Sequence, residues 1–404
     1  MKDIQGGVCA PLGFQASGIH CGIRKNKSKK DLALIVSDVM CHAASTYTLN
    51  KVKGAPIAVT KQHLSNGEAK AIICNSGNAN TCNPNGEEIA NQVCDLCAQT
   101  LNINANDIIV ASTGVIGQPL DIAPFENHMQ DLINALTYEG SSDACEGIMT
   151  TDTVKKEYAV EFELDNQICH IGAIAKGSGM IHPNMATMLA FVTTDVAISK
   201  EMLNEVIHEV VNDTFNMVSV DGDTSTNDML SVMANGLAQN KEITEKNKDY
   251  DLFKEALMSI CTNLSKGIAK DGEGATKLLT CHVSNACTIK DAKAVAKSVI
   301  TSSLFKAAMF GKDANWGRIL CAIGYCDASY DVDKIDVSLA SSVGKILVCE
   351  NGRGYPFSEE EALKILSEDE IEILIDLHDG QAQATAWGCD LTYDYVKING
   401  DYRT

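Results

Sequence analysis

The chain has 404 residues, of which 45% are hydrophobic, and its 53 acidic and 33 basic side chains give a formal net charge of −20. This length is typical of two domains, or of one large domain with an appendage, and the apolar content suffices for a core without disulfides or a structural metal. A strongly acidic surface repels nucleic acid and anionic membranes, so the composition excludes both as partners.

The N-terminal residues lack the apolar stretch of a signal peptide, and no apolar run approaches the roughly 20 residues that span a bilayer. We therefore expect a cytoplasmic protein, in which the 16 cysteines stay reduced. Most of them are expected to pack as small buried hydrophobic side chains. Cys94 and Cys97 form a C-x-x-C pair, but no second pair follows at zinc-finger spacing, so we predict a structural role and no metal site.

The spacing of apolar residues predicts an α/β protein. In the first half of the chain, the strands are expected at 31–36, 69–74, 108–112, 157–164 and 167–175, and the helices at 87–101 and 123–136. Residues 146–153 are rich in hydroxyl side chains and are expected to form a polar loop.

In the second half the same patterns predict a strand at 188–192, a helix that begins at Ser199 and a long helix at about 250–270. A second α/β segment begins near residue 276. Its strands are expected at 277–283, 335–339, 345–349, 372–377 and 381–391, and its helices at 291–309 and 359–366. The pattern at 319–325 fits either a helix or a strand.

Several strands end in polar loops that could line a pocket or form simple turns. Thr113 and Gly114 follow the strand at 108–112, where backbone N–H groups can turn outward and stabilise an oxyanion. Residues 221–228 are acidic, but they lack the ligand pattern of a calcium loop, so we do not expect calcium there. Glu273, between two glycines, could place a carboxylate beside a ligand or belong to an ordinary linker.

A sharp bend joins the apolar runs 171–175 and 188–192 near the middle of the chain. It contains two glycines, a proline and an asparagine, and Thr187 opens the second run. A threonine hydroxyl needs a base to act as a nucleophile. If the bond between Ala186 and Thr187 is broken, Thr187 gains an α-amine with an unperturbed pKa of about 7.7–8.0, and this amine can serve as that base.

Other side chains of the bend have alternative interpretations. Lys176 could pair with a substrate carboxylate or stabilise a tetrahedral intermediate, or it could be a solvated surface lysine. His182 could act as a base or have a purely structural hydrogen-bonding role. Because threonine is common at the start of a strand, the residue pattern alone makes Thr187 only a modest candidate.

The run from Lys176 to Leu189 resembles the self-cleavage motif of the glutamate N-acetyltransferase / ornithine acetyltransferase family. The resemblance extends over essentially the whole chain, and the other motifs follow in the order typical of the family. These motifs lie at 76–80, 111–117, 150–153, 220–228, 272–276, 313–318 and 398–404. The stretch 81–86 departs from the family pattern, and it lies outside the nucleophile motif.

The resemblance implies an enzyme of arginine biosynthesis that moves an acetyl group from N2-acetylornithine to glutamate, by a ping-pong reaction through an acetyl-threonine. It implies self-cleavage between Ala186 and Thr187 into an α chain, 1–186, and a β chain, 187–404. These chains are expected to assemble as a heterotetramer with two copies of each. No cofactor is implied, and the sequence leaves open whether acetyl-CoA is a second acetyl donor.

Residue by residue, the matching motifs imply that Thr187 is the nucleophile and that Thr113 and Gly114 form the oxyanion hole. The positions that match the family's substrate contacts are Thr153, Lys176, Thr187, Glu273, Asn399 and Thr404. The implied fold is an αββα sandwich at 1–275, similar to that of N-terminal-nucleophile hydrolases but differently connected. A smaller α/β domain is implied at 276–404, with a tail that returns to the active site.

Two other functions are alternatives. An N-terminal-nucleophile amidase or aminopeptidase would share Thr187 and self-cleavage but would release the acyl group to water. A non-catalytic binding protein, linked to a metal through its thiols, would stay uncut.

Overall fold

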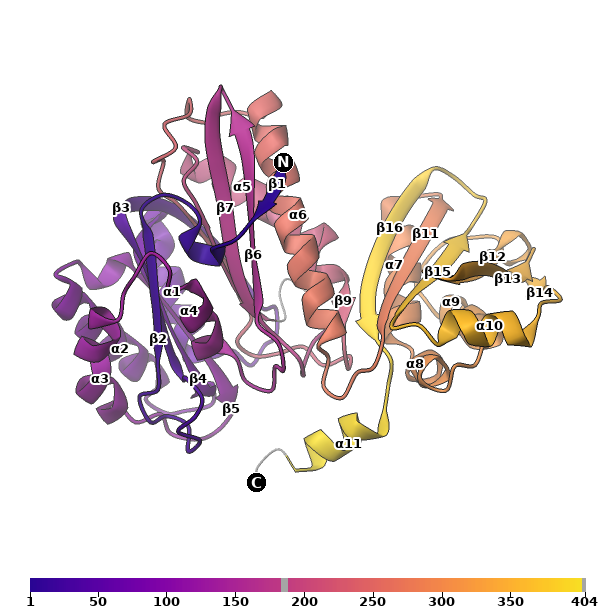
Figure 1. Cartoon of the computed structure of the whole chain (residues 1–404), viewed down its shortest axis with the longest axis horizontal. Coiled ribbons are helices and arrows are strands. Elements are labelled where there is room, and N and C mark those ends of the chain that lie inside the picture. Colours follow the sequence, from indigo (N-terminus) through magenta and orange to yellow (C-terminus); the bar gives the residue numbers. More distant parts are fainter. Residues whose placement is uncertain (183–187, 402–404) are drawn as a thin grey trace. The chain divides into compact units, whose positions relative to one another are not determined.

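The computed structural model describes residues 1–182 and 188–401 (Figure 1). These residues form two compact units. Unit 1 holds Met1–Gly177, 188–216 and Thr224–Leu264, and unit 2 holds Ser178–His182, Met217–Asp223 and 265–401. These are units of packing, and the predicted domain division between residues 275 and 276 stays a prediction.

Unit 1 is built on a nine-stranded sheet with the order β1-β6-β7-β8-β10-β3-β4-β5, in which β2 also pairs with β3. Two pairs, β4 with β5 and β8 with β10, are parallel, and the others are antiparallel. The strands are β1 (Lys2–Ile4), β2 (Phe14–Ile19), β3 (Leu32–Tyr47), β4 (Glu68–Asn78), β5 (Ile108–Val115), β6 (Lys156–Leu164), β7 (Gln167–Lys176), β8 (Leu189–Thr194) and β10 (Met229–Ala234).

The sheet bends within β3, its longest strand. The first part of β3 pairs with β2, and the second part pairs along the same edge with β10. Residues 38–40 between these parts are exposed, and the register against β4 shifts between Val36 and Cys41. The bend divides the sheet into two halves. The first is formed by β2, the first part of β3, β4 and β5, and the second is formed by the second part of β3, β10, β8, β7, β6 and β1.

The two halves pack face to face around one apolar cluster. Ile72 and Ile109 of the first half belong to the same cluster as Ile174 and Phe191 of the second half. The helix α4 (Ser141–Ile148) adds its apolar side chains to this cluster. The hydrophobic contact between the two halves therefore forms a double-sheet core.

Helices cover the sandwich. A second apolar cluster joins the first half of the sheet to α1 (Ala55–His63), α2 (Gly86–Leu101) and α3 (Ala123–Asn134). Helix α5 (Lys200–Asp213) packs against β3, and the apolar side of α6 (Lys248–Lys270) is fully buried. The layers are therefore helix, sheet, sheet and helix, and the predicted αββα class is confirmed.

Unit 2 is built on a seven-stranded sheet with the order β14-β13-β12-β15-β11-β16-β9. Helix α7 (Ile289–Thr301) packs on β11 and β16, and α10 (Glu359–Leu366) packs on β12 and β13. The strands are β9 (Val218–Ser219), β11 (Leu278–Ala286), β12 (Asp336–Ser341), β13 (Gly344–Glu350), β14 (Arg353–Gly354), β15 (Glu370–Asp376) and β16 (Ala382–Cys389).

The predicted polar loop at 146–153 needs correction, because its first residues lie in helix α4. Ala144, Cys145 and Ile148 of this helix are fully buried in the double-sheet core. The helix is short and rich in residues of weak helix propensity, so burial in the core stabilises it rather than its own sequence.

The single helix predicted at 291–309 is also wrong, because it is two helices, α7 and α8 (Ser303–Phe310). Ser302 between them has an extended backbone, and its hydroxyl accepts a hydrogen bond from Phe305 N at 3.3 Å, as an N-cap does. The ambiguous run at 319–325 lies largely in helix α9 (Trp316–Gly324). The sequence patterns did not indicate α1 or the last helix, α11 (Tyr393–Gly400).

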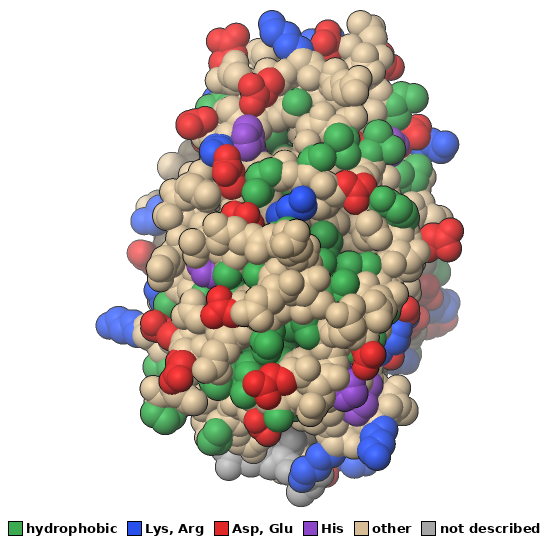
Figure 2. All heavy atoms as spheres, turned by 90° about the vertical axis from the view of Figure 1, so that its left-hand side faces the viewer, with side chains coloured by type: hydrophobic (Ala, Val, Ile, Leu, Met, Phe, Trp, Pro, Cys, Tyr) green, Lys and Arg blue, Asp and Glu red, His purple; other side chains and the backbone are tan. Residues whose placement is uncertain are grey.

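All 16 cysteines are free, and eleven of them are buried, as the sequence predicted for most. Cys94 and Cys97 are both buried on α2, and burial raises the pKa of the Cys97 thiol to about 12. On the face shown in Figure 2, acidic side chains are scattered among basic and apolar ones rather than gathered into one patch. Among the helices of the described residues, none has the length and apolarity that a membrane crossing needs.

Candidate active site

The predicted oxyanion residues lie at the end of strand β5 in unit 1. Gly114 has a φ of +133°, and a Cβ at this position would lie 2.4 Å from the carbonyl carbon of Gly77, so only glycine fits. Thr113 is buried, and within the described part of the chain its hydroxyl makes no hydrogen bond. The strand end therefore places a close-fitting backbone beside a hydroxyl group that is available to a ligand.

A buried amide holds this strand end in place. The Asn227 side chain donates from Nδ2 to the carbonyl of Ser112 at 2.9 Å and to the carbonyl of Ala79 at 2.6 Å. Its Oδ1 accepts a hydrogen bond from the Thr81 hydroxyl at 2.6 Å. Asn227 thus ties the residue before Thr113 to the polar loop that follows β4.

Lys176 lies at the end of strand β7, also in unit 1, and only 7% of it is exposed. Burial lowers the pKa of its amine, an effect that the neighbouring carboxylates of Asp152 and Asp228 oppose. Within residues 1–182 and 188–401, its Nζ makes no hydrogen bond and no ion pair. The alternative of a solvated surface lysine is therefore wrong, because Lys176 is buried.

Asp152 lies beside Lys176 and is saturated with hydrogen bonds. Its carboxylate accepts from Gly177 N at 2.7 Å, from Thr150 N at 2.9 Å and from Lys156 Nζ at 2.8 Å. Burial alone would raise the pKa of Asp152, but the ammonium groups of Lys156 and Lys176 and these hydrogen bonds outweigh it and hold the pKa well below its usual range. Asp152 therefore fixes the residue with which the central bend begins.

Asp228 has the opposite character. It is buried, and burial raises the pKa of its carboxyl group well above the usual range, against the effect of the Lys176 amine. Its Oδ2 has no hydrogen-bond partner among the described residues. Lys176 and Asp228 are therefore two titratable groups whose charges are disfavoured by burial and which retain unused hydrogen-bonding capacity.

Two predicted substrate contacts come together in unit 2. Asn399 Nδ2, on α11, donates to Glu273 Oε2 at 2.8 Å, although the two residues are 126 positions apart. Glu273 N donates to Ser178 O at 3.0 Å, and the Glu273 carboxylate lies so close to Gly179 that a Cβ there would approach it to 2.3 Å. The start of the bend is thus packed directly on Glu273.

The other predicted site residues are either exposed, outside the described residues or held in a structural hydrogen bond. Thr153 is exposed in the loop after α4. Ala186, Thr187 and Thr404 lie outside the described residues. The His182 ring nitrogen Nδ1 lies 3.1 Å from the Ser219 hydroxyl, and burial and the Lys297 charge lower the pKa of His182 to about 4. Its imidazole is therefore neutral at pH 7.

Four further residues belong to this region although no sequence pattern indicated them: Asp152, Lys156, Asn227 and Asp228. The motifs at 150–153 and 220–228 contain three of them, but nothing in the residue pattern distinguished these side chains from other polar loop residues. No group of three or more histidine, cysteine or acidic side chains within the described ranges could hold a metal ion.

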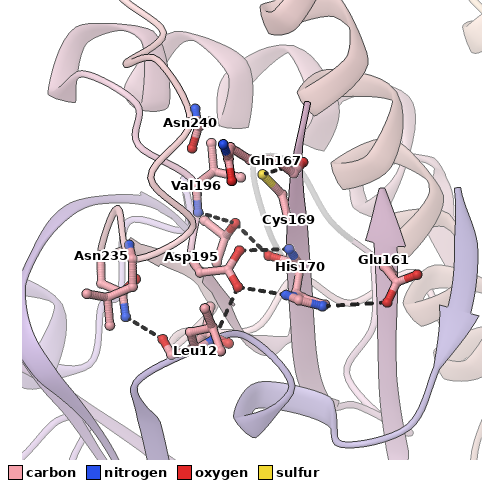
Figure 3. Close-up of polar contacts among 12 residues, drawn as sticks. Leu12, Glu161, Gln167, Cys169, His170, Asp195, Val196, Asn235 and Asn240 are labelled. Atoms are coloured by element: carbon pink, nitrogen blue, oxygen red, sulfur yellow. Dashed lines mark hydrogen bonds and ion pairs between the residues drawn. The ribbon is translucent and has the colours of Figure 1, made fainter. Parts of the chain in front are cut away.

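Strands β7 and β8 pair in unit 1, and Lys176 lies at one end of this pair. Another buried aspartate, Asp195, lies at the other end (Figure 3). Asp195 accepts from His170 N and faces His170 Nδ1, both at 2.7 Å, and it accepts from Leu12 N at 3.1 Å. Glu161 Oε2 lies 3.8 Å from His170 Nε2. The adjacent Cys169 donates to the Gln167 carbonyl, and burial raises the pKa of its thiol to about 12, so this aspartate–histidine pair has no activated thiol beside it.

Comparisons with known proteins agree with the motif resemblance. The sequence profile of the ArgJ family matches residues 15–404. The arginine biosynthesis bifunctional protein ArgJ of Caldanaerobacter subterraneus subsp. tengcongensis is 48% identical over 405 residues, which cover 100% of each chain. Arginine biosynthesis bifunctional protein ArgJ 1 of Clostridium acetobutylicum is 50% identical over 392 residues, 97% of this chain and 96% of the relative.

A crystal structure of the arginine biosynthesis bifunctional protein ArgJ from Bacillus halodurans is also similar. Its sequence is 47% identical, and the matched region covers 53% of this chain and 99% of the Bacillus halodurans chain, with a TM-score of 0.51. The family predicted from the motifs is therefore confirmed. With a profile match over nearly its whole length and full-length relatives at about half identity, the chain belongs to the ArgJ family.

Proposed function

We propose that the chain cleaves itself between Ala186 and Thr187 and then transfers acetyl groups from N2-acetylornithine to glutamate. One observation carries this proposal. The carbonyl of Met188, the residue after Thr187, accepts from Met229 N at 2.9 Å, and Leu189 pairs with Lys176. The chain just after the predicted nucleophile therefore lies beside Lys176 and beside the residue that follows Asp228.

In the proposed maturation, the Thr187 hydroxyl oxygen attacks the carbonyl of Ala186, and the peptide nitrogen leaves as the α-amine of Thr187. Water hydrolyses the resulting ester. The α-amine is then free to take the hydroxyl proton of the same residue. This explains how a threonine can act without a histidine base.

In the proposed transfer, the Thr187 hydroxyl attacks the acetyl carbonyl of N2-acetylornithine while its α-amine accepts the proton. The proton passes to the departing amine of ornithine, and the acetyl group stays on Thr187 as an ester. The amine of glutamate then attacks this ester and releases N-acetylglutamate. Thr113 and Gly114 would stabilise the negative oxygen in both steps, and Lys176, Glu273 and Asn399 would contact the substrates.

The burial and hydrogen bonding of two side chains support these roles. The Thr113 hydroxyl and the Lys176 amine are buried and hold no hydrogen bond within the described residues, as expected of groups that wait for a substrate. We propose no cofactor, and acetyl-CoA stays an open possibility as a second donor. We also propose a cytoplasmic location and a heterotetramer of α and β chains. The mass of the purified complex in solution would test the heterotetramer.

Thr187→Ala tests the nucleophile directly. We expect the variant to stay one uncut chain without transferase activity, because the attacking oxygen is gone. A denaturing gel would show the wild type as fragments of 1–186 and 187–404 and the variant as one band. Thr187→Ser, which keeps a hydroxyl, should still cleave. Cleavage that persists in Thr187→Ala would contradict the proposal.

Kinetic measurements distinguish the proposed transferase from the amidase alternative. An acetyl-threonine that waits for glutamate should release little acetate in its absence, and mass spectrometry should find acetyl on the Thr187 peptide after treatment with N2-acetylornithine. Parallel lines in double-reciprocal plots would support the ping-pong order. Acetate release at a rate that glutamate does not change would favour the amidase.

A further inference from the structure

Residues 178–182 lead directly into the stretch that contains the predicted cleavage bond, and they belong to unit 2. Met180 among them has a φ of +57°. This left-handed conformation is uncommon for a residue with a side chain and is unfavourable relative to the right-handed regions. Such a conformation persists only where the surroundings hold it, and it is concentrated at functional sites.

One carboxylate holds this turn. Asp221 Oδ2 accepts from Met180 N at 2.6 Å, and Asp221 Oδ1 accepts from Ile181 N at 2.9 Å. The neighbouring Val220 N donates to Ile181 O at 2.7 Å. Asp221 therefore binds both N–H groups of the left-handed turn, and charge-assisted hydrogen bonds of this kind are stronger than neutral ones.

The segment that carries Asp221 is itself well anchored within unit 2. Strand β9, just before it, pairs with β16 through Val218 and Trp387. The buried Lys306 ammonium on α8 donates to the carbonyl of Val220. The residues just before Asp221 are thus held by a strand pair and by a buried ammonium group. These contacts fix the position of the Asp221 carboxylate.

The other side of the turn is also held. Glu273 N donates to Ser178 O at 3.0 Å, and the Ser178 hydroxyl donates to Asp271 O at 2.7 Å. The turn at Met180 therefore lies between two fixed supports, one around Asp221 and one around Glu273. Of these supports, only Asp221 binds the N–H groups of the left-handed residue and of the residue that follows it.

We propose that Asp221 is a positioning residue for self-cleavage. By holding Met180 in the left-handed conformation, it fixes the backbone that leads into the predicted cleavage bond between Ala186 and Thr187. This inference rests on the proposed function. It adds that the rate of maturation depends on a carboxylate that takes no part in the bond exchange, because an intramolecular attack is fast only when the reacting atoms are held in position.

The test follows maturation of the full-length chain made by cell-free translation, with samples taken over time and separated on a denaturing gel. We expect Asp221→Asn to slow the disappearance of the precursor about tenfold, because the amide accepts at only one atom and turns an N–H group toward a donor. Asp223→Asn is the matched control. Asp223 is exposed in the same loop, and this variant should cleave at the wild-type rate.

Substitutions of Met180 test the backbone conformation without touching Asp221. Met180→Val should slow cleavage, since a β-branched residue strongly disfavours a positive φ. Met180→Gly combined with Asp221→Asn should recover much of the lost rate, because glycine adopts this conformation at little cost. A general loss of folding would lower the melting temperature and would not be recovered by glycine.

The outcomes separate the inference from the proposed function. A wild-type chain that stays uncut would refute self-cleavage and the role of Asp221 with it. A wild-type chain that cleaves, with Asp221→Asn equally fast, would overturn the inference alone. If Asp221→Asn does not fold, Met180→Val decides, and cleavage of that variant at the wild-type rate would overturn the inference.

Discussion

The two ends of the β7–β8 strand pair in unit 1 carry buried polar clusters of opposite character. At one end, Asp195 receives hydrogen bonds from the backbone of Leu12 and of His170 and contacts the His170 ring (Figure 3). At the other end, Asp228 Oδ2 and Lys176 Nζ make no hydrogen bond within the described residues.

We infer from the difference that the Asp195 cluster serves the fold and that the cluster of Lys176 and Asp228 is available to a ligand. A buried polar group normally has its partners, and an unsatisfied one costs free energy of folding. The Asp195 cluster meets this rule and fastens the N-terminal segment to β7. The Lys176 and Asp228 cluster does not meet it, and such exceptions are concentrated at binding and catalytic sites. Substitutions at the two ends should therefore affect different properties.

The largest effect on stability is expected at the saturated end. Asp195→Ala would leave two backbone N–H groups and the His170 ring without their acceptor, and we expect a loss of about 3–5 kcal/mol in the free energy of unfolding. Denaturant unfolding would measure it. Asp95→Ala, an exposed change on α2, is the control and should stay within about 0.5 kcal/mol of the wild type. Equal stability of both variants would remove the distinction between the two ends.

The second effect concerns two buried lysines. Lys176→Met should lower kcat/KM about a hundredfold, because the proposed charged contact to substrate is lost. It should change stability less than a substitution of Lys156 does, since Lys176 makes no hydrogen bond or ion pair in the described structure. Lys156→Met should instead lower the free energy of unfolding by about 3 kcal/mol, because Asp152 loses its ammonium partner, which lies at 2.8 Å. Full transferase activity in Lys176→Met would contradict the assignment.

The smallest effect is a change in pH dependence at the unsaturated end. Burial raises the pKa of Asp228 in the folded chain. A raised pKa means that the folded state favours the protonated form, so wild-type stability should fall as pH rises from about 4, the ordinary value, through the folded-state pKa. Asp228→Asn removes this titration and should be more stable than wild type at pH 7, where the wild type carries the cost of the buried carboxyl group.

Melting temperatures measured from pH 4 to pH 8 would check this expectation. The two curves should converge at the acidic end and separate as pH rises. Asp223→Asn, which removes an exposed carboxylate, should follow the wild type throughout. Parallel curves for Asp228→Asn and the wild type would mean that the carboxyl group is not held in its protonated form.

Much of the candidate site follows from the sequence, because strand ends with glycine and polar residues are recognisable there. Lys176, Thr113 and Gly114 stand at strand ends that the apolar pattern located. Glu273 stands out through its flanking glycines. The resemblance also predicts that the C-terminal residues return to the site; this stays a prediction, although Asn399 does contact Glu273.

Other features could not be obtained in this way. Helix α4 has weak intrinsic propensity and exists because the double-sheet core buries it. Asp152, Asn227 and Asp221 are ordinary loop residues in the sequence, and each gains its role from backbone N–H or carbonyl groups of a distant segment. A pattern of residue types carries no information about which loops become neighbours.

The sequence by itself determined the family, the alternation of strands and helices, and the glycine- and proline-containing bend before Thr187, because these depend on local periodicity and on motifs of fixed spacing. The tertiary structure decided which of the charged residues are buried and which of those are left with unused hydrogen-bonding capacity. Burial and hydrogen bonding of a side chain depend on segments far apart in the chain. For this reason only the folded structure distinguishes Asp195, whose carboxylate accepts hydrogen bonds from two backbone N–H groups, from Asp228, whose Oδ2 has no hydrogen-bond partner among the described residues.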